Sequence, residues 1–110
     1  MMMQADDVRR FLEGQEIYVF EPDTRTLVAV VNYEKGGRCA FRFSTGEADV
    51  GVYGFDGDAY WTRYEKFRNG ETHSFNLKSL GPGIAQAYFV DGTKAFLQAQ
   101  TTDLTVIVDV

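Results

Sequence analysis

The stretch Asp49–Lys78, DVGVYGFDGDAYWTRYEKFRNGETHSFNLK, decides the fold, because it reads as three strands joined by two tight turns. It also holds the only Trp and the only His of the chain. Asn69-Gly70 is a strong hairpin signal, since both residues tolerate the positive φ that a type I′ turn requires. A two-residue loop at this point predicts that Arg68 pairs with Glu71.

This register predicts which side chains share a face of the hairpin. It pairs Tyr64 with Phe75 and Thr62 with Leu77, so that one face is aromatic and apolar and the other is charged. The predicted aromatic face consists of Tyr60, Thr62, Tyr64, His73, Phe75 and Leu77. The predicted charged face consists of Trp61, Arg63, Glu65, Ser74, Asn76 and Lys78.

The preceding turn, Asp56-Gly57, leaves its register open. A two-residue loop made of these residues pairs Tyr53 with Tyr60. A slip of one residue moves Tyr53 to the opposite face, because side chains alternate along a strand.

Composition places the whole chain in one class. Its 110 residues predict a single domain over residues 1–110, large enough for one core. Aromatic residues make up 15% of the chain, which has eleven Gly and two Pro, and this mixture favours many short strands and tight turns. The predicted fold class is all-β.

Charge and cysteine content bear on partners and compartment. A formal net charge of −5 argues against nucleic acid or an anionic membrane surface as a partner. A single Cys excludes an internal disulfide. We find no apolar run of membrane-spanning length and no signal-peptide pattern, so we expect a cytoplasmic protein, or a periplasmic or secreted one whose leader is removed.

The N-terminal segment Asp6–Glu13 predicts a short amphipathic helix. Val8, Phe11 and Leu12 fall on one helical face, and Gly14 is placed to end the helix. A helix this short needs a surface to pack on, so we expect it to lie across the open end of a barrel.

Strand patterns fill the rest of the chain and give about eight or nine strands in total. A three-residue loop, Lys35-Gly36-Gly37, would pair Tyr33 with Cys39 on an uncharged face. This much hairpin connectivity predicts an up-and-down antiparallel barrel, closed by pairing of the last strand with the first. The further strands are expected at Glu16–Glu21, Thr26–Glu34, Ile84–Val90, Lys94–Gln100 and Leu104–Val110.

A family resemblance agrees with this architecture. Its motifs are the helix ending in Gly14, the central GVYG (51–54) and DGDAYWTRY (56–64) pair, and the late YFVDG turn (88–92). With these the chain resembles small bacterial lipocalin-like (calycin) domains of unassigned function, although GQE (14–16) stands where lipocalins have Gly-x-Trp. The resemblance implies a barrel with a central pocket for a small, largely apolar molecule, and it transfers no catalytic residue.

The aromatic face supplies the candidate site. Aromatic bodies with hydroxyl tips suit a cavity for a small apolar or aromatic molecule that carries a carboxyl or hydroxyl group. The predicted ligand-binding residues are Tyr53, Tyr60, Tyr64, His73 and Phe75. The same side chains could instead fill the barrel as its core.

Three alternatives remain at this point. If the charged face lines the lumen, Arg63 with Arg38 or Arg42 would anchor a carboxylate. A small-barrel lyase or isomerase would use His73 or a tyrosine as general acid or base, with a second titratable group in reach. A structural or interaction protein with a filled core is a third class of function.

The remaining expectations concern metals, cofactors and assembly. No second ligand is spaced to bind a metal with His73, and Cys39 is expected to be a small buried apolar residue, so we predict no metal site, no cofactor and no catalytic residue. Ile107, Val28 and Val30 are apolar where a solvated exterior would be polar. A homodimer packed through these side chains is therefore as compatible with the sequence as a monomer.

Overall fold

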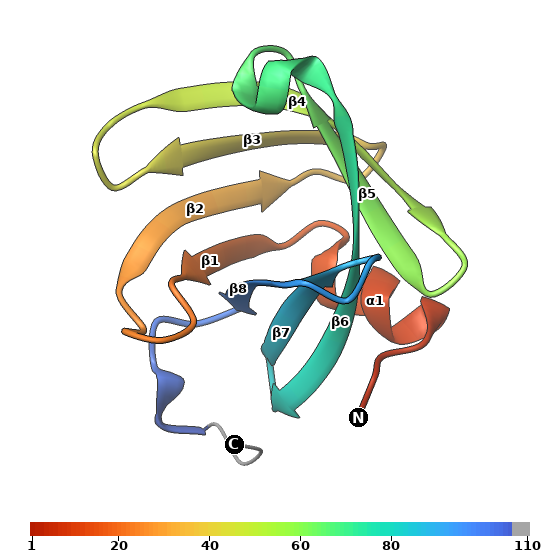
Figure 1. Ribbon diagram of the computed structural model, residues 1–110, viewed down its shortest axis with the longest axis vertical. Helices are drawn as coiled ribbons and strands as arrows, with labels where there is room; N and C mark the ends of the chain where they lie inside the picture. Colours follow the sequence, from red (N-terminus) through yellow and green to blue (C-terminus); the bar gives the residue numbers. More distant parts are fainter. Residues whose placement is uncertain (107–110) are drawn as a thin grey trace.

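Eight antiparallel strands follow one another in chain order around a closed barrel, after one N-terminal helix (Figure 1). The structure is a computed structural model, and it describes residues 1–106. The helix is α1 (Ala5–Leu12), and the strands are β1 (Glu16–Phe20), β2 (Leu27–Tyr33), β3 (Arg38–Phe43), β4 (Ala48–Asp56), β5 (Ala59–Tyr64), β6 (Thr72–Gly81), β7 (Ile84–Phe89) and β8 (Lys94–Ala99). Two short 3₁₀ segments are η1 (Phe67–Gly70) and η2 (Leu104–Val106). The all-β up-and-down barrel predicted from the sequence is confirmed.

The barrel closes one strand earlier than the sequence predicted. β1 pairs with β8, and Tyr18 lies opposite Ala99 at this seam. The prediction that Leu104–Val110 forms the closing strand is wrong for residues 104–106, which are the 3₁₀ segment η2, and the rest of that segment lies outside the described residues. Because eight strands already close the barrel, Leu104 packs instead against the small apolar cluster that includes Phe20 and Leu97.

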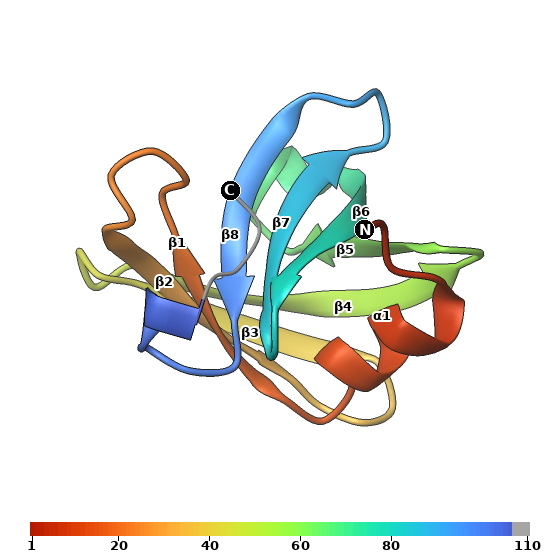
Figure 2. The same ribbon diagram turned by 90° about the horizontal axis from the view of Figure 1, so that it is seen from below.

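The helix α1 packs as predicted. Val8, Phe11 and Leu12 are buried in the main core cluster, and Gly14 follows the helix with a φ of +74°. The helix spans Ala5–Leu12, slightly earlier than the predicted Asp6–Glu13, and Figure 2 shows it lying against one end of the barrel. This end of the barrel is therefore closed by apolar side chains of the helix.

The loop 35–37 has the predicted length and register. Tyr33 lies opposite Cys39, and the backbone N–H of Glu34 donates to the carbonyl of Arg38 at 2.9 Å. Gly36 and Gly37 both have φ near +100°, a backbone conformation that residues with a side chain rarely adopt. The glycines therefore set the turn, and the turn sets the pairing of β2 with β3.

The predicted two-residue turn at Asn69-Gly70 is wrong. β5 ends at Tyr64 and β6 begins at Thr72, so the connection is a seven-residue loop, 65–71, that contains η1. Arg68, Asn69 and Gly70 all have a positive φ, and the loop therefore turns through three left-handed residues instead of two.

A contact from a distant strand explains the longer loop. The carboxylate of Asp49 accepts the backbone N–H groups of Lys66 and Phe67 at 2.8 and 2.9 Å. These hydrogen bonds lower the pKa of Asp49. They also hold residues 66 and 67 against β4, so these residues do not continue β5 and do not pair with β6.

The predicted faces of β5 and β6 are nevertheless correct. Phe75 lies opposite Tyr60 instead of Tyr64, a displacement of four residues, and an even displacement keeps every side chain on its face. The β4–β5 turn is Gly57-Asp58, which places Tyr53 opposite Thr62 with its ring buried in the barrel. The open register of Tyr53 is thereby resolved in favour of the inward face.

The exterior carries the charged side chains. Arg38, Arg42 and Arg63 are all exposed, so the alternative in which they line the lumen is wrong. Val28 and Val30 are both half-exposed, and Val28 also lines the cavity inside the barrel. Ile107, the other side chain of the dimer contact considered above, lies outside the described residues.

Candidate functional site

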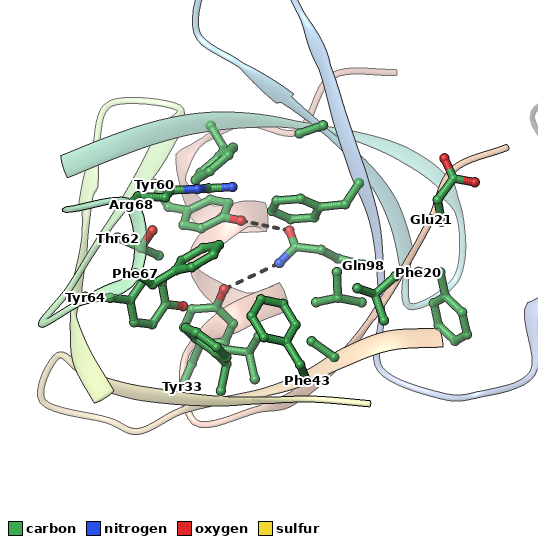
Figure 3. Close-up of a pocket in the computed structure, with 18 of the residues that line it drawn as sticks. Phe20, Glu21, Tyr33, Phe43, Tyr60, Thr62, Tyr64, Phe67, Arg68 and Gln98 are labelled. Atoms are coloured by element: carbon green, nitrogen blue, oxygen red, sulfur yellow. Dashed lines mark hydrogen bonds between the residues drawn. The ribbon is translucent and has the colours of Figure 1, made fainter. Parts of the chain in front are cut away.

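The barrel encloses a cavity of about 260 Å³ on the side away from α1 (Figure 3). Some of the residues that line it are half-exposed, and five of these, which we call the mouth, are Glu21, Pro22, Phe43, Phe67 and Arg68. The described residues that line the cavity are mostly apolar, and nine of the nineteen are Phe or Tyr, so its walls suit a flat aromatic molecule.

Three buried polar side chains form the inner end of the cavity, which we call the floor: Tyr33, Tyr60 and Gln98. The Tyr60 hydroxyl donates to Oε1 of Gln98 at 3.0 Å, and Nε2 of Gln98 lies 3.5 Å from the Tyr33 hydroxyl. Gln98 has no exposed surface. The floor therefore combines a satisfied polar network with an otherwise apolar wall.

Stacked rings support the walls. The ring of Tyr60 lies 5.2 Å from that of Phe75 at an interplanar angle of 28°, and Tyr64 meets Phe41 edge-on at 4.8 Å. Phe67, from the loop 65–71, also meets Phe41 edge-on at 5.0 Å. These contacts fix the shape of the cavity, because each ring is held by a neighbour.

Arg68 places the positive charge of the cavity at the mouth. Its guanidinium carbon lies 5.0 Å from the ring centroid of Phe67, 5.4 Å from that of Phe75 and 5.5 Å from that of Phe89. Burial lowers the pKa of Arg68, but a guanidinium keeps its proton in proteins. Within residues 1–106, no carboxylate forms an ion pair with it.

The acidic residue of the mouth faces away from Arg68. Glu21 uses its carboxylate to accept the backbone N–H groups of Asp23 and Thr24 at 2.9 and 2.6 Å, and these hydrogen bonds lower its pKa. In Figure 3 it lies across the cavity from Arg68. The charges of Glu21 and Arg68 are thus separated. Within residues 1–106, the carboxylate of Glu21 has hydrogen-bond donors, whereas the guanidinium of Arg68 has no ion-pair partner.

Three of the five predicted ligand-binding residues line this cavity, namely Tyr60, Tyr64 and Phe75. Tyr53 lies behind Tyr33, where its hydroxyl donates to the carbonyl of Glu34 at 2.7 Å. His73 is half-exposed and lies opposite Thr62, and its Nδ1 has no hydrogen-bond partner among the described residues. Neither Tyr53 nor His73 is among the residues that line the cavity.

Sequence analysis missed Arg68, Phe67 and Gln98. The hairpin register had assigned Arg68 to a cross-strand pair with Glu71, and the same register made Phe67 part of a strand. Gln98 lies in a strand of small and apolar residues, KAFLQA (94–99), and a lone Gln in such a strand was the available signal for a buried polar contact.

We compared the chain with protein-family models, with curated proteins and with solved structures. None of them matches it. The site is therefore interpreted from its own geometry.

Burial keeps the acidic groups of the lumen protonated. It raises the pKa of Tyr33, Tyr60 and Tyr64 above the ordinary value of a tyrosine, and it raises the pKa of the Cys39 thiol to about 11. A general base works best with a pKa near the working pH, so these groups are poorly suited to proton abstraction at neutral pH. They are suited to donating hydrogen bonds.

These shifts predict that the fold loses stability in alkali. The folded state favours the neutral forms, so this stability is present below the ordinary pKa values of 9.0 for Cys and 10.0 for Tyr and is lost as the pH rises above them. We expect the denaturation midpoint to fall steadily above about pH 9. Tyr64→Phe should weaken this dependence, because it removes one of the buried hydroxyls. A midpoint that stays constant to about pH 11 would contradict the burial of these groups.

Searches for two other kinds of site give negative results over residues 1–106. No group of three or more His, Cys, Asp or Glu side chains is placed to hold a metal ion. No helix in this part of the chain has the length and apolar character needed to cross a bilayer.

Proposed function

We propose that the protein binds a small, mainly apolar or aromatic molecule in the lumen of its barrel. The observation that carries this proposal is the aromatic cavity of about 260 Å³ with its half-exposed mouth. An engineered apolar cavity of about 150 Å³ is large enough for benzene. The volume here suits one substituted ring or a small bicyclic molecule, and the tyrosine hydroxyls and Gln98 amide of the floor offer it polar contacts.

The architecture supports a binding function over a filled structural core. Eight strands give a barrel just wide enough to be filled by its own side chains or to hold one small ligand. Here small residues, Ala29 and Ala95, line the cavity between the aromatic side chains. A closed up-and-down barrel with a helix at one end also supports the resemblance to lipocalin-like (calycin) domains.

Filling the cavity tests the proposal. Naphthamide, a neutral bicyclic probe, should bind the wild-type protein in isothermal titration calorimetry. Ala95→Phe places a ring in the cavity from a half-exposed wall position, and we expect it to weaken naphthamide binding by about tenfold or more.

The matched control is Ala40→Phe. Ala40 is half-exposed, pairs with Asn32 and Val50, and does not line the cavity, so this variant should bind naphthamide like the wild type. Circular dichroism would show that both variants fold. Absence of naphthamide binding to the wild type, or equal binding by the two variants, would refute a ligand site in the lumen.

A further inference from the structure

We propose that the ligand of the lumen carries a carboxylate, which Arg68 binds at the mouth while the apolar body of the ligand enters the barrel. This inference rests on the proposed function and adds the chemical class of the ligand. It is carried by the position of a half-buried guanidinium, without an ion-pair partner within residues 1–106, on the lining of an aromatic cavity.

The energetics of Arg68 favour an anionic ligand. A half-buried charge loses hydration, and proteins normally offset this cost with an ion of opposite sign. Within residues 1–106, the guanidinium of Arg68 lies over the rings of Phe67, Phe75 and Phe89, which attract a cation more weakly than a carboxylate does. A ligand carboxylate would supply the missing charge through the two parallel hydrogen bonds that a guanidinium can donate.

The backbone conformation of Arg68 also supports a ligand site. Its φ of +56° and ψ of +36° lie in the left-handed region, which is unfavourable for a residue with a long side chain. Such conformations persist where the surrounding structure fixes them, and they concentrate at ligand sites. Here the Asp49 hydrogen bonds to Lys66 and Phe67 fix the loop, and the conformation carries the Arg68 side chain to the cavity.

The acidic residue of the mouth does not neutralise Arg68. Glu21, the acidic residue of the mouth, is already engaged by the backbone of its own turn and lies across the cavity from Arg68 (Figure 3). Since the chain carries a net charge of −5, an anion gains nothing from the overall field. Recognition of the carboxylate is therefore assigned to the single side chain of Arg68.

A pair of isosteric probes tests the assignment. At pH 7, naphthoate and naphthamide differ in charge but hardly in shape, and calorimetry should show that the wild type prefers naphthoate by about 10- to 100-fold, as expected for a charged hydrogen-bonded pair. Arg68→Met should remove this preference, so that the two probes bind with similar affinity. Arg68→Lys should retain part of it, and added salt should weaken binding of naphthoate alone.

The control is Arg63→Met, which removes one positive charge from the exposed face of β5, and it should preserve the preference for naphthoate. Equal affinity of the wild type for both probes would overturn the carboxylate assignment and leave the lumen site intact. Equal loss of both probes in Arg68→Met would also overturn it, because Arg68 would then only shape the mouth. If neither probe binds the wild type, the proposed function fails and this inference fails with it.

Discussion

Tyr60→Ala is expected to lower the free energy of unfolding by about 3–5 kcal/mol, as for other large truncations of buried aromatic side chains. The Tyr60 ring has no exposed surface, stacks on Phe75 and meets Tyr33 edge-on at 6.2 Å. Its hydroxyl is also the hydrogen-bond donor to Gln98. Because domains of this size are stable by only about 5–15 kcal/mol, this one change should remove a large part of the total.

Two variants separate the contributions of ring and hydroxyl. Tyr60→Phe keeps the ring and should cost only about 1–3 kcal/mol, the usual range for a buried acceptor left unpaired. Tyr18→Ala truncates a half-exposed tyrosine of β1 and should cost less than Tyr60→Ala. Urea denaturation measures all three. A loss in Tyr60→Ala no greater than that in Tyr18→Ala would show that the barrel is not packed around this ring.

Gly51→Ala is expected to destabilise the protein by about 3 kcal/mol, the upper end of the usual cost of overpacking. A Cβ at Gly51 would meet the carbonyl oxygen of Arg63 and come within 2.8 Å of Cα of Tyr64, so β4 and β5 would have to separate. The φ of Gly51 lies outside the left-handed region, so the cost is steric rather than conformational.

Gly54→Ala provides the comparison on the same strand. Its Cβ would meet the ring of Trp61, a half-exposed side chain that can move, whereas at Gly51 the obstacle is backbone. We expect a smaller loss for Gly54→Ala by thermal denaturation. If Gly51→Ala were as stable as the wild type, the close pairing of β4 with β5 would be incorrect.

Features that depend on local sequence could be predicted. The loop 35–37 contains two glycines that adopt positive φ, and its length alone sets the pairing of Tyr33 with Cys39. The inward faces of β5 and β6 follow from strict alternation, which survives a four-residue error in register. The buried face of α1 follows from its helical spacing.

Features that depend on contacts between distant parts of the chain could not be predicted from the sequence. Asn69 and Gly70 do adopt positive φ. However, the carboxylate of Asp49 accepts hydrogen bonds from the backbone of Lys66 and Phe67, which lie 17 and 18 residues away in sequence. No pattern within the hairpin reveals that contact. The prediction therefore paired Arg68 with Glu71 across a two-residue turn.

The candidate site shows the same division. Alternation predicted that Tyr60, Tyr64 and Phe75 share a face, and all three line the cavity. Tyr53 is also buried in the barrel, but the order of residues around the barrel places it behind Tyr33. Whether space remains between inward side chains depends on how all eight strands pack together, so the sequence left the open and filled barrels as alternatives.

A crystal structure of the protein soaked with bromonaphthoate tests the central claim most directly, because the anomalous signal of bromine locates the probe independently of the fitted side chains. The predicted result is a bromine peak inside the barrel, between the floor and the mouth, with the carboxylate at the guanidinium of Arg68. A barrel filled by its own side chains, with bromine bound only on the outer surface, would contradict the account.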